Sequence, residues 1–282
     1  MSDDVAKTYL RPDDINKLPA GKADYRIPYG DDPLQFGDLR LPTGQGPFPI
    51  AIVVHGGCWI SYFADVAFMN PVAEALTRAG IATWNIEYRR VDHVGGGWPG
   101  TFTDVAQAVD HVRELAIAHP LDLQRVIILG HSAGGHLGHW AAARHRLPKD
   151  SPLASDNPLP VIGVINISGP GDIKPFLAIQ ERVCGDVPIT RLVGGTPEEV
   201  PDRYRQASPV ELLPLGIKQV LIIGDHDESV PSEFGRQYEK AGQASGDDVT
   251  FIELEDTGHF EAIAPGTLAW AKVEAVARTM LD

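Results

Sequence analysis

The sequence contains few cysteines, little basic charge and no long hydrophobic run. Only two cysteines, Cys58 and Cys184, occur in 282 residues, so we do not expect a disulfide framework to hold the fold. Lys and Arg number 24 against 38 Asp and Glu, a formal charge of −14. This acidic balance argues against nucleic acid and anionic lipid as partners. No apolar run approaches the roughly 20 residues of a membrane-spanning helix, so a membrane is not an expected partner either.

The N-terminal sequence also lacks a secretory signal. Its residues MSDDVAKTYLRPDDINKLP are acidic and contain no apolar core segment of the kind that signal peptides carry. We therefore expect a cytoplasmic protein. The polar, proline-containing residues 1–22 indicate an arm that runs over the surface, and residues 23–282 are expected to form a single domain.

The hydrophobic pattern predicts an α/β fold. Two short strands come first, a buried β-branched strand follows, and strands then alternate with helices. The predicted strands cover 23–30, 35–42, 49–57, 81–89, 125–130, 161–169, 219–224 and 249–255, and the predicted helices cover 70–79, 101–119, 231–241, 267–281 and a segment that starts at Ser132. This order predicts a mostly parallel eight-stranded sheet with helices on both faces. Residues 170–218 contain many prolines and no clear strand, so we expect a cap-like excursion there, near the active site.

A serine stands in a cluster of glycines between a predicted strand and a predicted helix. Residues 130–134 read GHSAG and match G-x-S-x-G, the motif of a nucleophile on a sharp strand-to-helix turn. The glycines relieve crowding around Ser132, and the helix that starts there directs N–H groups toward charge that develops near it. A glycine-rich turn without catalytic function is the alternative, but the strand–turn–helix context favours a nucleophile.

A serine nucleophile needs a histidine base, and the chain has ten histidines. His136 and His139 have an i,i+3 spacing that occurs in metal sites but is more typical of packing, and we expect neither a metal nor a cofactor. His259 follows the last predicted strand, where a loop can place it against Ser132. We therefore interpret His259 as the base.

The base in turn needs an acid that orients it. Asp225, Asp227 and Glu228 follow the strand 219–224 within four positions. The start of a helix nearby also attracts acidic residues without any catalytic role. We prefer Asp227, because it completes the chain order nucleophile, acid, base that this type of enzyme uses. Asp225 is the second choice, and Glu228 is the third.

Attack by a serine on a carbonyl creates an oxyanion that two N–H groups must stabilise. One is expected from Ala133, directly after the serine. The other is expected from the loop His55–Trp59, which follows a buried strand and contains Gly56 and Gly57. Glycines allow backbone amides to approach a ligand closely. An ordinary glycine turn is the alternative for this loop.

These motifs together resemble one superfamily. HGGCW, GHSAGG, D-x-D-x-x-V-P and GHF resemble the α/β-hydrolases, and within them the esterase and lipase group with the HGGxW oxyanion motif. That group includes kynurenine formamidases and small acetyl- or feruloyl-type esterases, and the resemblance covers about residues 23–281. It implies that the amides of Gly56, Gly57 and Cys58 hold the oxyanion and that Trp59 braces the loop. Cys58 and Cys184 could pair, but we expect two buried thiols.

The resulting expectation is a serine hydrolase that cleaves a small carboxylic ester through an acyl-enzyme intermediate. Hydrolysis of an aryl formamide uses the same machinery and is the main alternative. A binding protein of this fold without catalysis is less favoured, because no member of the Ser132, Asp227, His259 triad is missing. Trp59, Trp98 and His131 are expected to contact substrate, and a homodimer is compatible with the sequence.

Overall fold

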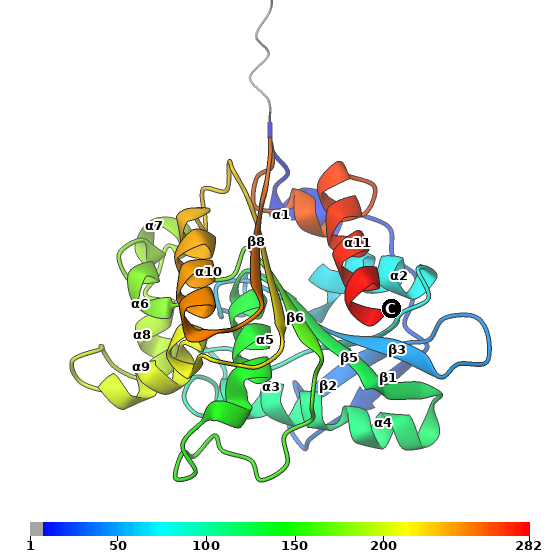
Figure 1. The fold of residues 1–282 in the computed structure, drawn as a ribbon, viewed down its shortest axis with the longest axis horizontal. Helices are drawn as coiled ribbons and strands as arrows, with labels where there is room; N and C mark the ends of the chain where they lie inside the picture. The colour runs from blue at the N-terminus through cyan, green and yellow to red at the C-terminus, as the bar shows by residue number, and fades with distance from the viewer. Residues whose placement is uncertain (1–7) are drawn as a thin grey trace, which may run out of the picture.

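The computed structural model describes residues 8–282 and contains one eight-stranded sheet (Figure 1). Its strand order is β1-β2-β4-β3-β5-β6-β7-β8. The pairs β1–β2 and β2–β4 are antiparallel, and the other pairs are parallel. The strands are β1 (Tyr25–Pro28), β2 (Phe36–Arg40), β3 (Phe48–Val54), β4 (Ala82–Ile86), β5 (Leu121–His131), β6 (Gly163–Ile167), β7 (Lys218–Gly224) and β8 (Val249–Leu254). The expected fold class and sheet are confirmed.

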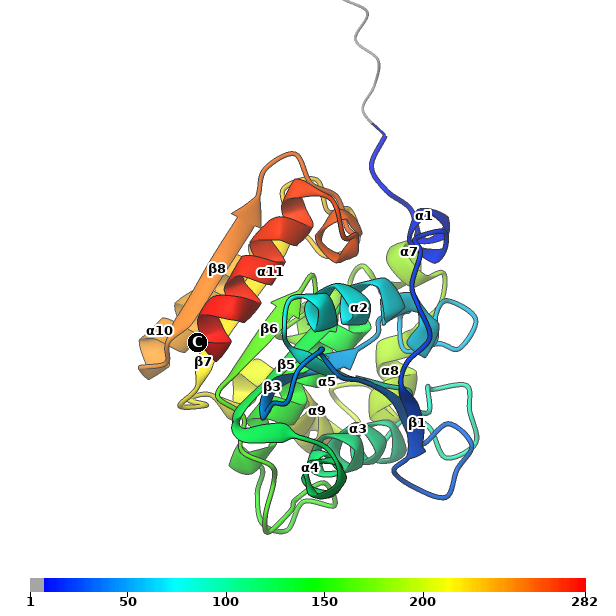
Figure 2. The same ribbon diagram turned by 90° about the vertical axis from the view of Figure 1, so that its right-hand side faces the viewer.

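Helices cover both faces of the sheet, so the central strands are apolar on both sides. Alternate residues of β3 enter opposite cores: Ile50 and Ile52 belong to one buried cluster, and Ala51 and Val53 belong to the other. The helices outside 170–218 are α1 (Pro12–Asn16), η1 (Val66–Met69), α2 (Asn70–Arg78), α3 (Gly100–Asp110), α4 (Val112–Ala118), α5 (Ala133–Ala143), η2 (Arg144–Arg146), α10 (Glu233–Ser245), η4 (Glu261–Ile263) and α11 (Leu268–Leu281). Figure 2 shows α2 and α11 side by side on one face. Residues of α3, α4 and α5 fill the cluster on the other face.

The segment 170–218 consists of short helices and connecting chain. They are α6 (Ile173–Phe176), α7 (Gln180–Cys184), α8 (Pro188–Val193), α9 (Pro201–Ala207) and η3 (Pro209–Leu212), and they gather at the left of Figure 1. Ile173, Leu192 and Tyr204 are fully buried in the same cluster as Ile50 and Ile52. The segment is therefore packed onto the main core, and no separate core of its own supports it.

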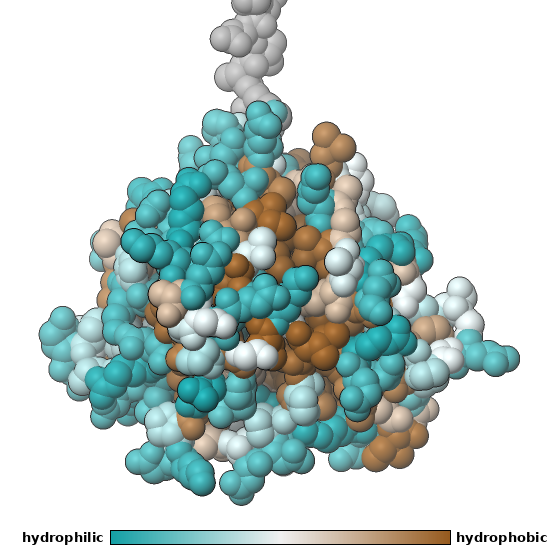
Figure 3. Space-filling view, in the orientation of Figure 1, coloured by the Kyte–Doolittle hydropathy of each residue, from teal (hydrophilic) through white to brown (hydrophobic). Residues whose placement is uncertain are grey.

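The surface of the molecule is mainly polar on the face that Figure 3 presents. An apolar band runs down this face between α10 and α11, along the edge strand β8. Phe251 and Ile252 of β8 are half-buried there. Over residues 8–282, none of the helices combines the length and the apolar character that crossing a membrane requires.

His136 and His139 of α5 lie in the interior and contact different partners. His136 Nε2 donates to the carbonyl oxygen of Ala207 at 2.8 Å. His139 Nε2 donates to the side-chain oxygen of Gln219 at 2.9 Å, and its Nδ1 accepts from Asn166 at 3.1 Å. Burial lowers the pKa of each histidine to about 4. Both side chains are therefore neutral packing groups.

These two buried histidines predict that the protein loses stability in weak acid. In the folded protein their pKa is about 4, below the unfolded value of about 6.5. Between pH 4 and pH 6.5, unfolding is therefore accompanied by proton uptake. The stabilisation is complete above pH 6.5 and is lost as the pH falls toward 4, at up to about 3 kcal/mol per pH unit for two protons. Urea unfolding at pH 7, 6 and 5 measures this dependence. An unfolding free energy that stays constant between pH 7 and 5 would contradict it.

Candidate active site

Ser132 occupies a sharp corner between β5 and α5. Its backbone has φ 53° and ψ −121°, a conformation that residues other than glycine rarely adopt. A Cβ atom on Gly130 would lie 2.1 Å from the carbonyl oxygen of Gly134, and one on Gly134 would lie 2.2 Å from that of Val54. The corner therefore requires glycine at both positions. The Ser132 amide donates to the carbonyl oxygen of Ile167 at 2.8 Å and so fastens the corner to β6.

His259 and Asp227 form a hydrogen-bonded pair on the loops that follow the neighbouring strands β8 and β7. His259 Nδ1 donates to Asp227 Oδ2 at 2.7 Å. The other oxygen, Oδ1, accepts from the backbone amides of Ser229 and Val230 at 2.8 Å each. The side chain of Asp227 has no exposed surface, and that of His259 is 9% exposed. Two backbone amides and the imidazole thus fix the orientation of the Asp227 carboxylate.

The Asp227 carboxyl is kept ionised by its partners. Burial alone would raise its pKa, but the interactions with His259, the amide of Val230 and the hydroxyl of Ser168 outweigh burial and lower the pKa below its ordinary value. A charged Asp227 stabilises a positive charge on the imidazole of His259.

The other two acids after β7 lie elsewhere. Asp225 is exposed, and its carboxylate accepts the backbone amide of Thr257 at 3.1 Å. Glu228 is exposed as well. Of the three acids considered from the sequence, the structure brings Asp227 into contact with His259.

His131, which precedes the serine, contacts the backbone of the histidine loop. Its Nε2 donates to the carbonyl oxygen of His259 at 2.9 Å. Burial and the nearby ring of His259 lower the pKa of His131 to about 3, so its side chain is neutral. Since it is only 1% exposed, its main contact is with this loop, although it also borders the cavity beside Ser132.

The loop after β3 adopts an unusual backbone next to the serine. Gly57, Cys58 and Trp59 have φ values of 105°, 52° and 57° in succession. A Cβ atom on Gly56 would lie only 3.0 Å from Cβ of Ser132, so glycine allows this close approach. Ala133 is the first residue of α5, and the amide of such a residue has no partner within its helix. The loop after β3 and the first residue of α5 therefore both lie close to Ser132.

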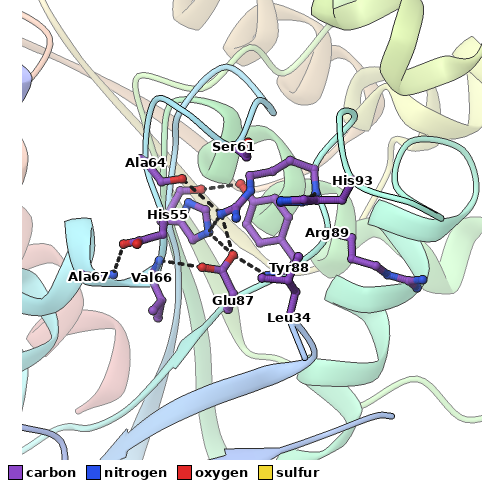
Figure 4. A network of polar contacts seen from close by, with 12 residues as sticks. Leu34, His55, Ser61, Ala64, Val66, Ala67, Glu87, Tyr88, Arg89 and His93 are labelled. Atoms are coloured by element: carbon purple, nitrogen blue, oxygen red, sulfur yellow. Dashed lines mark hydrogen bonds and ion pairs between the residues drawn. The ribbon is translucent and has the colours of Figure 1, made fainter. Parts of the chain in front are cut away.

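A buried polar network holds this loop from below (Figure 4). Glu87 Oε1 contacts Nε2 of His55 at 3.0 Å and Nη1 of Arg90 at 2.7 Å, and Oε2 accepts the amide of Val66 at 3.0 Å. Tyr88 donates its hydroxyl to the carbonyl oxygen of His55 at 2.8 Å. Burial alone would raise the pKa of Glu87, but its interactions with His55 and Arg90 lower it to about 2. No short motif in the sequence indicates this network.

Cys58 and Cys184 form a disulfide, so the expectation of two buried thiols is wrong. Their Cα atoms are 6.0 Å apart. Cys184 ends α7, and the bridge therefore joins the loop after β3 to the segment 170–218. Pairing depends on how this segment returns to the sheet, which the spacing of the two cysteines in the sequence does not reveal.

Two tryptophans expected at the substrate lie away from the cavity. Trp59 is 1% exposed, and its ring packs edge-on against His136 and Phe176 at centroid distances of 5.4 and 6.0 Å. Trp98 packs against Phe102 at 5.5 Å. Neither ring lines the cavity beside Ser132, and contact of these two side chains with substrate stays a prediction. Trp59 instead connects its loop to α5 and α6.

Ser132 and His259 line one small cavity of about 250 Å³. Its wall is largely apolar and includes phenylalanines that no motif in the sequence indicates as site residues. Its other principal lining residues are Gly57, Cys58, Phe63, Phe68, His131 and Phe260. Among residues 8–282, no group of three or more His, Cys, Asp or Glu is placed to hold a metal ion. A serine and a histidine paired with a carboxylate, at one apolar cavity, are groups that acyl transfer uses.

Structural comparison identifies the fold as that of the α/β-hydrolases. A truncated carbohydrate esterase from gut microbiota superposes with a TM-score of 0.77 at 22% identity, over 93% of this chain and 96% of the other. A propionate-bound esterase from Thermogutta terrifontis gives a TM-score of 0.69 at 20% identity, over 91% and 93% of the two chains. At these identities the likeness concerns the fold.

Residues 38–241, more than half of the chain, match the family model of BD-FAE, and the chain belongs to this family. It is 27% identical over 257 residues to Esterase LipC of Mycobacterium tuberculosis, covering 89% of this chain and 63% of the relative. It is 24% identical over 268 residues to Esterase EstD of Thermotoga maritima, covering 85% and 64%. The chain thus spans slightly less than two thirds of these curated relatives.

Replacing the two candidate acids separately tests which one orients His259. We expect Asp227→Asn to lower kcat for a p-nitrophenyl ester by about 10³- to 10⁴-fold, because the amide no longer stabilises a charged imidazole. Asp225→Asn removes the same charge two residues away and is expected to change kcat less than about threefold. Steady-state kinetics of both variants decides between them. Equal losses of kcat in the two variants, or a larger loss in Asp225→Asn, would show that Asp227 is not the residue that orients His259.

The network below the loop predicts that Glu87→Gln lowers the stability of the protein. This variant leaves the charge of Arg90, whose side chain is 4% exposed, without a carboxylate partner. We expect the unfolding free energy to fall by about 3 kcal/mol. Glu114→Gln removes the same charge from an exposed position of α4 and should change stability by less than about 0.5 kcal/mol. Equal stability of the two variants in urea unfolding would show that the network contributes little.

Proposed function

We propose that this protein is a serine hydrolase that cleaves small carboxylic esters through an acyl-enzyme intermediate. The observation that carries the proposal is the placement of Ser132 and His259 at one cavity, with Asp227 bound to Nδ1 of the histidine. This bond leaves Nε2 of His259 to accept the proton of the serine. The esterase names of LipC and EstD support the same class of reaction.

The proposed reaction begins when Ser132 Oγ attacks the ester carbonyl and its proton passes to His259 Nε2. Asp227, which stays ionised, stabilises the resulting imidazolium. The carbonyl oxygen becomes an oxyanion, which accepts hydrogen bonds from the amide of Ala133 and from that of Gly57 or Cys58. The start of α5 adds its positive dipole end at this point.

The tetrahedral intermediate then collapses as the bond between the carbonyl carbon and the alcohol oxygen breaks. The leaving alcohol takes the proton from His259, and the acyl group stays on Ser132. Water next attacks the acyl-enzyme and gives a proton to His259, and the bond to Ser132 Oγ breaks as the acid leaves. The proton returns to the serine, so the enzyme is regenerated.

The cavity supports a small substrate. Its volume of about 250 Å³ lies below the range of about 300–1,000 Å³ that is common for drug-sized ligands. Its wall of phenylalanines favours an apolar group, and no Arg or Lys of the described residues 8–282 lines it. An aryl formamide would use the same groups for attack, but no contact in the cavity favours a formamide over an ester.

Replacing the serine tests the proposal directly. We expect Ser132→Ala to reduce turnover of p-nitrophenyl acetate by at least about 10⁴-fold, because no other group can form the acyl-enzyme. Ser155→Ala, at an exposed position, should leave turnover unchanged. Urea unfolding of both variants checks that the fold persists.

Two outcomes would contradict the proposal. Residual activity of Ser132→Ala near that of the wild-type protein would exclude the serine as nucleophile. A higher kcat/KM of the wild-type protein for N-formylkynurenine than for any short-chain p-nitrophenyl ester would assign the protein to formamide hydrolysis instead.

A further inference from the structure

The segment Tyr9–Ile15 lies within the N-terminal arm and is hydrogen-bonded to the chain around His259. The described part of residues 1–22 begins at Thr8. The ring of Tyr9 stacks on His226 with centroids 5.0 Å apart and an angle of 24° between the planes. The segment therefore reaches the edge of the sheet where the strands β7 and β8 end.

Glu261 connects this segment to the histidine loop through two backbone hydrogen bonds. Its Oε1 accepts the amide of Leu10 at 2.6 Å, and its Oε2 accepts the amide of Gly258 at 2.9 Å. Gly258 directly precedes His259. One carboxylate thus links the N-terminal segment to the residue before the proposed base.

The short helix α1 is anchored by a single apolar side chain. Ile15 is 1% exposed and belongs to the same buried cluster as Phe68 and Ile263. Asp13, Asn16 and Lys17 are exposed. One buried residue among polar ones explains why the hydrophobic pattern of this segment did not predict a docked helix.

Pro12 stands at the start of α1 and reaches the cavity. It lines this space together with Val183 of α7, Phe63, Phe68 and Phe260. Its own surface is exposed, so it lies at the rim and not at the base of the cavity. In Figure 1, α1 lies near the top of the molecule, and α7 lies at the left among the other helices of the segment 170–218.

We propose that the segment Tyr9–Ile15 forms one wall of the substrate cavity and that Pro12 limits the length of the acyl chain that the cavity accepts. The inference rests on the proposed ester hydrolysis. A short acyl group fits between Ser132 and the phenylalanines without reaching the rim. A longer chain extends along this apolar wall and meets Pro12, which Ile15 and Glu261 hold in place.

The test compares Pro12→Trp with Asp13→Trp. Both variants place the same large ring on α1, but Asp13 does not line the cavity. We expect Pro12→Trp to lower kcat/KM for p-nitrophenyl octanoate at least tenfold more than for p-nitrophenyl acetate. Asp13→Trp should leave the ratio of the two constants within about twofold of the wild-type ratio. Thermal unfolding of both variants is recorded alongside.

The outcomes separate this inference from the proposed function. If the wild-type protein cleaves both esters and Pro12→Trp changes the ratio no more than Asp13→Trp, the cavity wall does not select the acyl chain and the inference is wrong. If Pro12→Trp lowers both constants equally, the segment has only a structural role and the inference is wrong as well. If the wild-type protein cleaves neither ester, the proposed function itself is wrong.

Discussion

The left-handed backbone of Ser132 is the constraint on which the rest of the site depends. This conformation directs the serine away from the line of β5 and lets α5 begin directly behind it. The corner forms only because Gly130 and Gly134 leave room for carbonyl oxygens that a Cβ atom would strike. Strain of this kind costs about 1–3 kcal/mol and persists where the surroundings determine the conformation. Here α5 supplies that support, because every residue from Ala133 to Ala143 is buried.

The facing loop must then approach the serine closely, and two features hold it there. Below it, the buried carboxylate of Glu87 contacts His55 and Arg90. Beside it, the Cys58–Cys184 disulfide joins it to α7. Disulfides are typical of oxidising compartments. The bridge therefore argues against the cytoplasmic location that the N-terminal sequence predicts. That location stays a prediction.

The sequence predicted those parts of the molecule that depend on local pattern and chain order. The β-branched run around Ile52 marked a central strand, since only a strand buried on both faces is apolar throughout. Asp227 was preferred over Asp225 from chain order, and the structure pairs it with His259. The roles of these residues in catalysis stay predictions until they are tested.

The parts that the sequence did not predict depend on contacts between distant segments. Trp59 looked suited to a substrate, but whether a ring faces a cavity or the core is decided by the neighbours His136 and Phe176. Pro12 lies in a polar segment with one buried residue, too few to produce a helical pattern. The Glu87 network joins residues that follow β3 and β4 to η1, and no short motif indicates such an arrangement.

The central claim is that the corner serine is the nucleophile, and covalent labelling measures this most directly. A fluorophosphonate reacts with a serine only where a base activates it and N–H groups accept the phosphoryl oxygen. We expect intact-mass analysis to show one adduct per chain, and peptide mapping to place it on Ser132. An unlabelled protein, or an adduct on another residue, would contradict the account.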